Sequence, residues 1–347
     1  MTNRVGNHRR WHDWQYATLG FGILIIVLAA CSPSTPSMLD SHGPQADKIA
    51  ALSWLMFGIA ALVFIVVTSF LLVAFIRSRR ELLIAQASSD MDRRAIMLVL
   101  VGGAVIPVVV LFAIMVLSVT TDPANAAFDR SALDIEVIGH RWWWEVHYPD
   151  QSITTANEIH IPVNQAVVLH VTSADVIHSL WIPQLNGKFD MIPGQTNTVS
   201  IQASQTGVYR GECAEFCGMQ HAHMSFMVVA EDADQFNKWQ TNEQKPAAAL
   251  DPSTQSAIFE GQQTFLGSSC VYCHTIKGTN ASGTLGPDLT HIASRATIGA
   301  GVLANTPGNL AGWIINSQAI KPGNLMPPMD LDSDQLQAIL AYFRTLQ

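Results

Sequence analysis

Charged residues are scarce in this chain: they make up 13% of its 347 residues, whereas hydrophobic residues make up 49%. A chain with so little charge and so many apolar residues does not fit a wholly soluble protein. The chain is also not basic, because its formal net charge is −8. Nucleic-acid binding needs a surplus of lysine and arginine, so we expect no nucleic-acid partner.

Cysteine is also rare, and its five residues are Cys31, Cys213, Cys217, Cys270 and Cys273. Disulfides are the ordinary use of cysteine in a chain that leaves the cytoplasm. Each of these five, however, lies in a short pattern with another use. The chain length leaves room for two or three domains around those patterns.

The N-terminus has the layout of a secretory signal peptide over residues 1–31. Three arginines precede an uncharged apolar run, residues 17–30, that is short for a membrane span. The run ends in a Leu28 to Cys31 sequence that resembles a bacterial lipobox, which predicts cleavage and lipidation at Cys31. An uncleaved third span with an incidental cysteine is the alternative.

Two long apolar runs follow, at residues 49–76 and 95–121, and neither contains a charged residue. Each can cross a bilayer, so residues 49–121 are predicted to form a transmembrane helix hairpin. Arginines cluster between the runs, and the positive-inside rule places that loop in the cytoplasm. Everything after Asp122 is then predicted to lie on the outer, periplasmic face of a bacterial plasma membrane.

Beyond the hairpin, residues 130–240 change to short β-rich runs separated by turn residues. Strands are predicted at 134–148, 158–161, 166–171, 197–201, 207–211 and 225–231. This spacing predicts an antiparallel sandwich or barrel. Such a scaffold suits electron transfer because it holds metal ligands in a fixed geometry.

Soft metal ligands are concentrated in twelve residues of this domain: Cys213, Cys217, His221 and Met224. Thiolate, thioether and imidazole together are the ligands that select copper. Two thiolates can bridge two metal ions, so the pattern predicts a dinuclear copper centre. It needs a second histidine from elsewhere in the chain, and His178, in a loop-like segment after an apolar strand, is one candidate. The sequence position alone does not choose among the candidates His178, His140, His147, His160, His170 and His223.

A linker is predicted at residues 241–253, followed by a second outer domain at 254–347. Cys270, Cys273 and His274 form Cys-x-x-Cys-His, the attachment signal for c-type haem, with the histidine as proximal iron ligand. Thioredoxin-like chemistry is the main rival, but no βαβ pattern surrounds the motif. Met326 and Met329 are candidates for the sixth ligand. Met326 is favoured because the pattern resembles class I cytochromes c, in which a Met-Pro step precedes a final amphipathic helix, here predicted at 333–346.

Together these patterns resemble cytochrome c oxidase subunit II fused to a class I cytochrome c domain, as in a caa-type haem–copper oxidase. The resemblance to subunit II covers roughly residues 49–239 and is carried by segments 139–145, 176–194 and 213–224. The cytochrome c resemblance spans 256–347. The two resemblances together imply a multidomain membrane protein with a two-helix hairpin, a β-sandwich or barrel cupredoxin domain and an all-α cytochrome c domain.

The resemblance also implies roles for individual residues in a dinuclear copper centre, CuA. Its ligands would be His178, Cys213, Glu215, Cys217, His221 and Met224. Both cysteines would bridge the coppers, each histidine would bind one, Met224 would be a weak axial ligand and Glu215 would give its carbonyl. The Glu215 side chain would also help to hold magnesium at subunit I. Trp142 would receive the electrons, unless the tryptophans at 142–144 simply pack inward or at the membrane interface.

The implied function is to pass electrons from cytochrome c, or a membrane donor, through haem c and CuA to subunit I. The complex of subunit I with the other oxidase subunits would reduce oxygen to water and translocate protons, whereas this chain would carry no oxygen-reducing site. A CuA-containing nitric oxide reductase and a membrane-anchored copper or haem assembly protein are the alternatives. Family members often carry a glutamate early in the second span, whereas residues 98–103 contain no acid. The resemblance therefore does not extend to proton uptake through this subunit.

Overall fold

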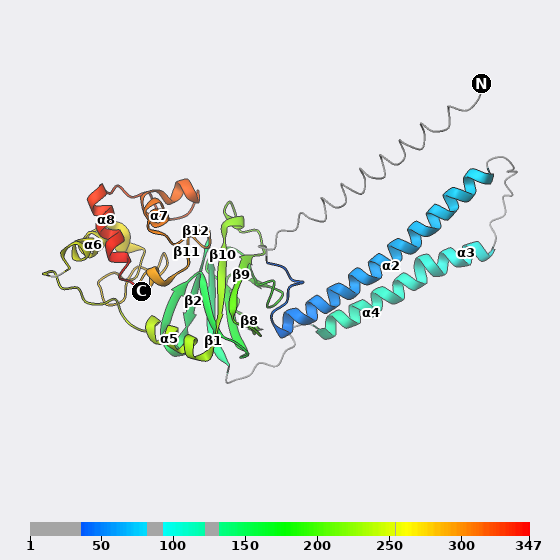
Figure 1. The fold of residues 1–347 in the computed structure, drawn as a ribbon, viewed down its shortest axis with the longest axis horizontal. Coiled ribbons are helices and arrows are strands. Elements are labelled where there is room, and N and C mark those ends of the chain that lie inside the picture. The colour runs from blue at the N-terminus through cyan, green and yellow to red at the C-terminus, as the bar shows by residue number, and fades with distance from the viewer. Residues whose placement is uncertain (1–35, 82–92, 122–131, 254) are drawn as a thin grey trace, which may run out of the picture. The chain divides into compact units, whose positions relative to one another are not determined.

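The two uncharged runs form a helix hairpin in the computed structural model, which describes residues 36–81, 93–121, 132–253 and 255–347. Helix α2 spans Pro44–Glu81, and α3 (Arg93–Leu100), the π-helical turn η1 (Val101–Val105) and α4 (Ile106–Thr121) follow one another without a break. Helices α2 and α4 lie side by side (Figure 1). Both arms are long and apolar enough to cross a membrane, as predicted. The predicted signal peptide and lipobox lie outside the described residues.

The second arm changes its helical winding where the sequence contains proline. Pro107 has no N–H for the carbonyl four residues earlier, and its ring would clash with that carbonyl in a regular helix. The wider π-helical turn η1, directly before α4, gives the ring room. The helix therefore passes the proline without ending.

The β-rich region forms a sandwich of two five-stranded sheets, with strand orders β3-β2-β1-β5-β8 and β4-β10-β9-β6-β7. The first sheet contains β1 (Leu133–His140), β2 (Trp143–Tyr148), β3 (Ile153–Ala156), β5 (Val167–Ser173) and β8 (Asn197–Ile201). The second contains β4 (Glu158–Pro162), β6 (His178–Trp181), β7 (Lys188–Met191), β9 (Gly207–Cys213) and β10 (Ser225–Glu231). Two neighbouring pairs, β1 with β5 and β4 with β10, are parallel. The sandwich is therefore mixed, where an antiparallel one was predicted.

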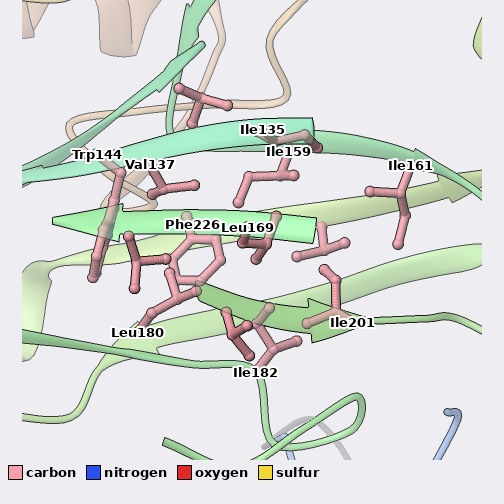
Figure 2. Packing of buried hydrophobic residues seen from close by; sticks show 14 of the residues in the cluster. Ile135, Val137, Trp144, Ile159, Ile161, Leu169, Leu180, Ile182, Ile201 and Phe226 are labelled. Carbon is pink, nitrogen blue, oxygen red and sulfur yellow. The ribbon is translucent and has the colours of Figure 1, made fainter. Parts of the chain in front are cut away.

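Alternate residues of these strands point into the space between the sheets and are fully buried. Figure 2 shows the resulting core, with Ile135, Leu169 and Phe226 packed among other apolar side chains. Gly211 permits this packing, because a Cβ there would lie 2.2 Å from the ring of Phe226. Burial of such side chains stabilises a fold by about 1.5–3 kcal/mol each, which makes the sandwich a rigid support for the loops at its ends.

The predicted strand 134–148 is wrong as a single strand. The chain turns at Arg141 and Trp142, and β1 and β2 then pair as an antiparallel hairpin with Gly139 opposite Trp144. Trp142 lies in the turn and Trp143 and Trp144 continue directly into β2, so a run of strand-favouring aromatic residues concealed the turn. Strands β3, β6 and β7 are further elements that the sequence did not predict.

The region after the sandwich is helical. Helix α5 spans Ala233–Glu243, so the first three residues of the predicted linker, 241–243, belong to a helix. Helices α6 (Ser256–Leu266), α7 (Pro307–Ile320) and α8 (Ser333–Phe343) follow, with the 3-10 turns η5 (Ser269–Tyr272) and η6 (Ile292–Ser294) and the short strands β11 (Thr297–Ile298) and β12 (Leu303–Ala304). The predicted final helix is confirmed and begins with a capping box.

Helices α6 and α8 cross closely at Gly261, where a Cβ would lie 1.9 Å from the carbonyl oxygen of Ala338. Phe265, Ile339 and Tyr342 form the core at this crossing. Ser37–Gln347 form one compact unit, and the sandwich and the helical region contact each other within it.

Candidate copper and haem sites

The soft ligands lie on the loop that joins β9 to β10. Strand β9 ends at Cys213 and β10 begins at Ser225, and the backbone N–H of Cys213 donates to the carbonyl of Met224 at 3.0 Å. This bond closes the loop at its base, so that the first and last predicted ligands lie together. Cys217 and His221 lie on the loop between them.

His178 reaches this loop through strand pairing. It is the first residue of β6, although the sequence predicted a loop-like segment there, and β6 pairs with β9 so that Leu180 lies opposite Cys213. The side chain of His178 is fully buried. Among the described residues, His178, Cys213 and Cys217 form the one group of ligand atoms that could hold a metal ion.

The donor atoms of the predicted copper site surround the two sulfurs. Cys213 Sγ lies 3.8 Å from Cys217 Sγ, 3.7 Å from His178 Nδ1 and 3.2 Å from the carbonyl oxygen of Glu215. Cys217 Sγ lies 3.6 Å from His221 Nδ1 and 3.8 Å from Met224 Sδ. A disulfide would bring the sulfurs to about 2.05 Å, so both cysteines are free.

These separations fit ligands that share metal ions. With metal–sulfur bonds of about 2.3 Å and metal–nitrogen bonds of about 2.0 Å at tetrahedral angles, two sulfurs lie about 3.8 Å apart, and a sulfur and a nitrogen about 3.5 Å. The sulfur–sulfur distance and both sulfur–nitrogen distances are close to these values. Thiolate, imidazole and thioether donors favour copper.

The two thiols differ in acidity. The hydrogen bond between them lowers the pKa of Cys213 to about 3, with His178 contributing, and the same contact raises the pKa of Cys217. Two negative sulfurs at this distance repel each other, so the second thiolate forms readily only when cations lie between them. The pair is therefore arranged to release protons on binding metal.

Asp175 fixes the orientation of His178. Its Oδ1 lies 2.9 Å from His178 Nε2, which leaves Nδ1 directed at Cys213. Burial opposes the charged imidazole, but the hydrogen bonds with Cys213 and Asp175 raise the pKa of His178. A carboxylate that holds the far nitrogen of a ligand histidine is a common feature of metal sites. Asp175 lies three positions before His178, and that spacing alone would not have singled it out.

The competing histidines have other partners. His140 and His147 both contact Glu145, His160 contacts Glu231, His170 contacts Asp134 and His223 contacts Gln220. None of them is in the group of ligand atoms around Cys213. The structure therefore selects His178 from the candidates that the sequence left open.

Trp142 lies directly against the copper-ligand loop. Its indole Nε1 donates a 2.9 Å hydrogen bond to the carbonyl oxygen of Cys217, and its ring packs on Gly218. Trp142 and Trp144 are both buried, whereas Trp143 is half-buried and stacks on His140. Inward packing of two tryptophans, the alternative weighed from the sequence, is thus observed, and one of the two also contacts the site.

The haem motif lies at the end of α6. Cys270 is within the 3-10 turn η5 and Cys273 caps it, so the motif is on a tighter helical turn than an α-helix, and both thiols are free. His274 Nδ1 lies 2.7 Å from the carbonyl oxygen of Pro287, which fits an N–H donor at Nδ1 and leaves Nε2 for iron. Burial lowers the pKa of His274 and so favours the neutral, metal-binding form.

Gly286 packs closely against the His274 ring, because a Cβ at this position would lie 2.7 Å from His274 Cε1. This close packing supports the assignment of His274 as the iron ligand. The segment around Met326 is fixed by its backbone: the Met326 N–H donates to Asn324 Oδ1, and its carbonyl accepts from Ser317 and Gln318. Met329 Sδ accepts a 3.8 Å contact from Ser269 Oγ, beside Cys270. The choice between the methionines stays a prediction.

Fold and sites together define a membrane-anchored electron-transfer protein. Residues 151–231 match the family "Cytochrome C oxidase subunit II, periplasmic domain", and residues 258–347 match the family "Cytochrome c". These matches imply copper in the β-sandwich and haem c in the helical region that follows it.

Relatives with assigned names agree with the domain matches. The chain is 32% identical to "Cytochrome c oxidase subunit 2" of Alkalihalophilus pseudofirmus, over 96% of this chain and 98% of that one. It is 32% identical to the protein of the same name from Bacillus sp. strain PS3, over 63% of this chain and 64% of that one. The chain belongs to the cytochrome c oxidase subunit II family and is part of an oxidoreductase complex. Among solved structures, the periplasmic domain of subunit II from Bradyrhizobium japonicum is 30% identical, with a TM-score of 0.33, over 34% of this chain and 96% of that one.

Proposed function

We propose that this chain receives electrons at a covalent haem c and passes them through a dinuclear copper centre to the oxygen-reducing centre of subunit I. The cluster of donors around Cys213 and Cys217 carries this proposal, because both sulfurs have a histidine nitrogen at 3.6–3.7 Å. Two sulfurs, each paired with its own imidazole, provide for two metal ions. Copper bound there supplies one-electron redox chemistry.

The surrounding residues have separate tasks in this proposal. Cys213 and Cys217 would hold both ions, His178 and His221 would each hold one, and Met224 would be a further, weaker ligand. The Glu215 carbonyl, 3.2 Å from Cys213 Sγ, completes the set. The sandwich holds these donors in nearly fixed positions, which limits rearrangement when the charge of the site changes.

The Glu215 side chain is free for a second role, because Glu215 is exposed while its carbonyl faces the sulfurs. We propose that its carboxylate helps to hold magnesium against subunit I, since hard oxygen ligands suit that ion. Replacing Glu215 with Gln should then lower the magnesium content of the assembled oxidase and leave its copper content unchanged.

In the second region, Cys270 and Cys273 would attach the haem, and His274 and Met326 would hold its iron. The bond of His274 to Pro287 leaves Nε2 for the iron. The helix hairpin anchors the chain in the bacterial plasma membrane, with both redox regions on the periplasmic face. Cytochrome c or a membrane-bound protein is the donor.

The decisive experiment counts metals in the purified full-length chain. Two coppers and one haem that resists extraction by acid acetone are expected per chain, together with a mixed-valence copper signal in electron paramagnetic resonance. One copper per chain would contradict the dinuclear centre. Extractable haem would contradict covalent attachment. An assembly protein would instead give up its copper readily to a chelator.

A further inference from the structure

Lys321 is a buried lysine that follows α7 on the segment leading to Met326, and only 2% of it is exposed. Its Nζ donates hydrogen bonds to three backbone carbonyls, at 2.7 Å to Trp142, 2.7 Å to His223 and 2.8 Å to Gly299. An ammonium group has three N–H donors, so all of them are used. Burying an ammonium is costly unless it is fully hydrogen-bonded, so the arrangement indicates a specific contact rather than the filling of space.

The three carbonyls belong to different parts of the chain. Trp142 lies at the turn between β1 and β2, and His223 lies on the loop that carries the copper ligands. Gly299 follows β11 in the haem-binding region. A single side chain therefore ties the segment that leads to Met326 to both the tryptophan and the copper-ligand loop.

Neighbouring polar contacts extend the same interface. Gln220 Nε2 donates a 2.8 Å hydrogen bond to the carbonyl oxygen of Pro322, and Ser225 Oγ donates a 3.0 Å bond to that of Ala300. Both side chains come from the copper domain, and both acceptors come from the haem-binding region. The haem-binding region is thus held against the copper-ligand loop at several points.

These contacts cover Trp142. A Cβ on Gly323 would lie 3.0 Å from Met219 Cε and 3.7 Å from the Trp142 ring, and the ring packs on Gly218 from the copper side. Only 8% of Trp142 is exposed. A separate donor protein therefore has almost no access to this ring while the contacts persist, whereas Gly323, on the segment leading to Met326, lies beside it.

We propose that Lys321 is a positioning residue that holds the haem-binding region on Trp142, so that this tryptophan takes electrons from the chain's own haem domain. External donors then deliver their electrons to the haem domain and not to the copper domain. The proposal rests on the proposed function, because it assumes that haem and copper exchange electrons. It also makes the short linker a connection between docked parts rather than a free tether.

The test compares Lys321→Met with Lys277→Met in the full-length chain, assembled in the oxidase with both cofactors bound. Lys277 is a matched control, because its Nζ makes one 3.2 Å bond to the carbonyl of Ser152 across the same two regions. Hydrogen exchange of the peptides that contain Trp142 and His223 reports docking. The rate of copper reduction after flash photoreduction of the haem reports electron transfer.

Lys321→Met is expected to speed exchange in both peptides and to slow haem-to-copper transfer several-fold, with cofactor contents and both reduction potentials unchanged. Lys277→Met should leave exchange and transfer near the wild-type values. Unchanged exchange in Lys321→Met overturns the proposal, whatever the transfer rate. If that variant does not assemble, Gln220→Ala removes the neighbouring bond to the carbonyl oxygen of Pro322 and must have the same two effects. Absence of copper or haem in the wild type would contradict the proposed function instead.

Discussion

The indole Nε1 of Trp142 and the carbonyl oxygen of Cys217 are joined by a 2.9 Å hydrogen bond in a nearly dry environment. Cys217 is at the same time one of the two thiols at the centre of the copper-ligand cluster. The bond therefore connects the aromatic ring covered by the haem-binding region to the backbone of a copper ligand.

Replacing Trp142 with Phe should slow the arrival of electrons at copper several-fold, because the hydrogen bond to Cys217 is lost and the aromatic surface shrinks. Copper content should stay the same, since Trp142 is not a ligand. Flash photoreduction followed at the copper absorption band measures the rate. Trp143→Phe is the control, because Trp143 is in the same hairpin and stacks on His140. Equal rates in the two variants would remove Trp142 from the path.

Replacing Cys217 with Ser should abolish the mixed-valence copper signal and leave haem reduction intact. Only Cys213 would remain as a soft anionic ligand, and one thiolate cannot build the two-sulfur bridge. Electron paramagnetic resonance detects the copper, and optical spectra detect the haem. Ala222→Ser puts a hydroxyl on an exposed position of the same loop and should keep both signals. Loss of both signals in Cys217→Ser would point to misfolding.

Replacing Asp175 with Asn should weaken copper binding by about 10–100-fold, the usual effect of losing a carboxylate behind a ligand histidine. The amide cannot hold His178 Nε2 as a carboxylate does, so the imidazole turns more freely. Titration against a competing copper chelator measures the affinity. Asp190→Asn, on an exposed part of β7, should bind copper as the wild type does. An unchanged affinity in Asp175→Asn would show that packing alone orients His178.

The sequence predicted the helix hairpin because membrane spans depend on length and apolar composition, which are local properties. It also predicted the ligands from Cys213 to Met224, since they lie within one loop. His178 could not be chosen by position, because its place depends on the pairing of β6 with β9. No sequence pattern singled out Lys321. Its three carbonyl partners are backbone groups, which a sequence does not distinguish.

Replacing Met326 with Leu should open the sixth coordination site of the haem, so that the reduced protein binds carbon monoxide readily. The side chains are similar in volume, and the backbone bonds of Met326 with Asn324 and Ser317 do not depend on the sulfur. Met329→Leu is the matched comparison and should keep the haem closed to carbon monoxide. The reverse outcome would assign the ligand to Met329.

Glu145 offers a pH-dependent test of the β1–β2 hairpin that carries Trp142. Hydrogen bonds from His140 and His147 outweigh the effect of burial and lower the pKa of Glu145 from 4.5 to about 2. A carboxyl whose pKa is depressed in the folded state stabilises it above the unfolded pKa, and this contribution is lost as the pH falls from about 4.5 to about 2.

Glu145→Gln should therefore lower the stability of the copper domain by about 1–3 kcal/mol near pH 7, and the difference from wild type should shrink below pH 4.5. Denaturant unfolding, monitored by tryptophan fluorescence, follows this difference. Glu136→Gln changes an exposed carboxyl on the neighbouring strand and should leave the free energy of unfolding nearly unchanged. If Glu145 acts through its charge, its contribution to stability must fall as the carboxyl is protonated. A stability difference between Glu145→Gln and wild type that stays constant down to pH 3 would therefore mean that the glutamate acts by packing.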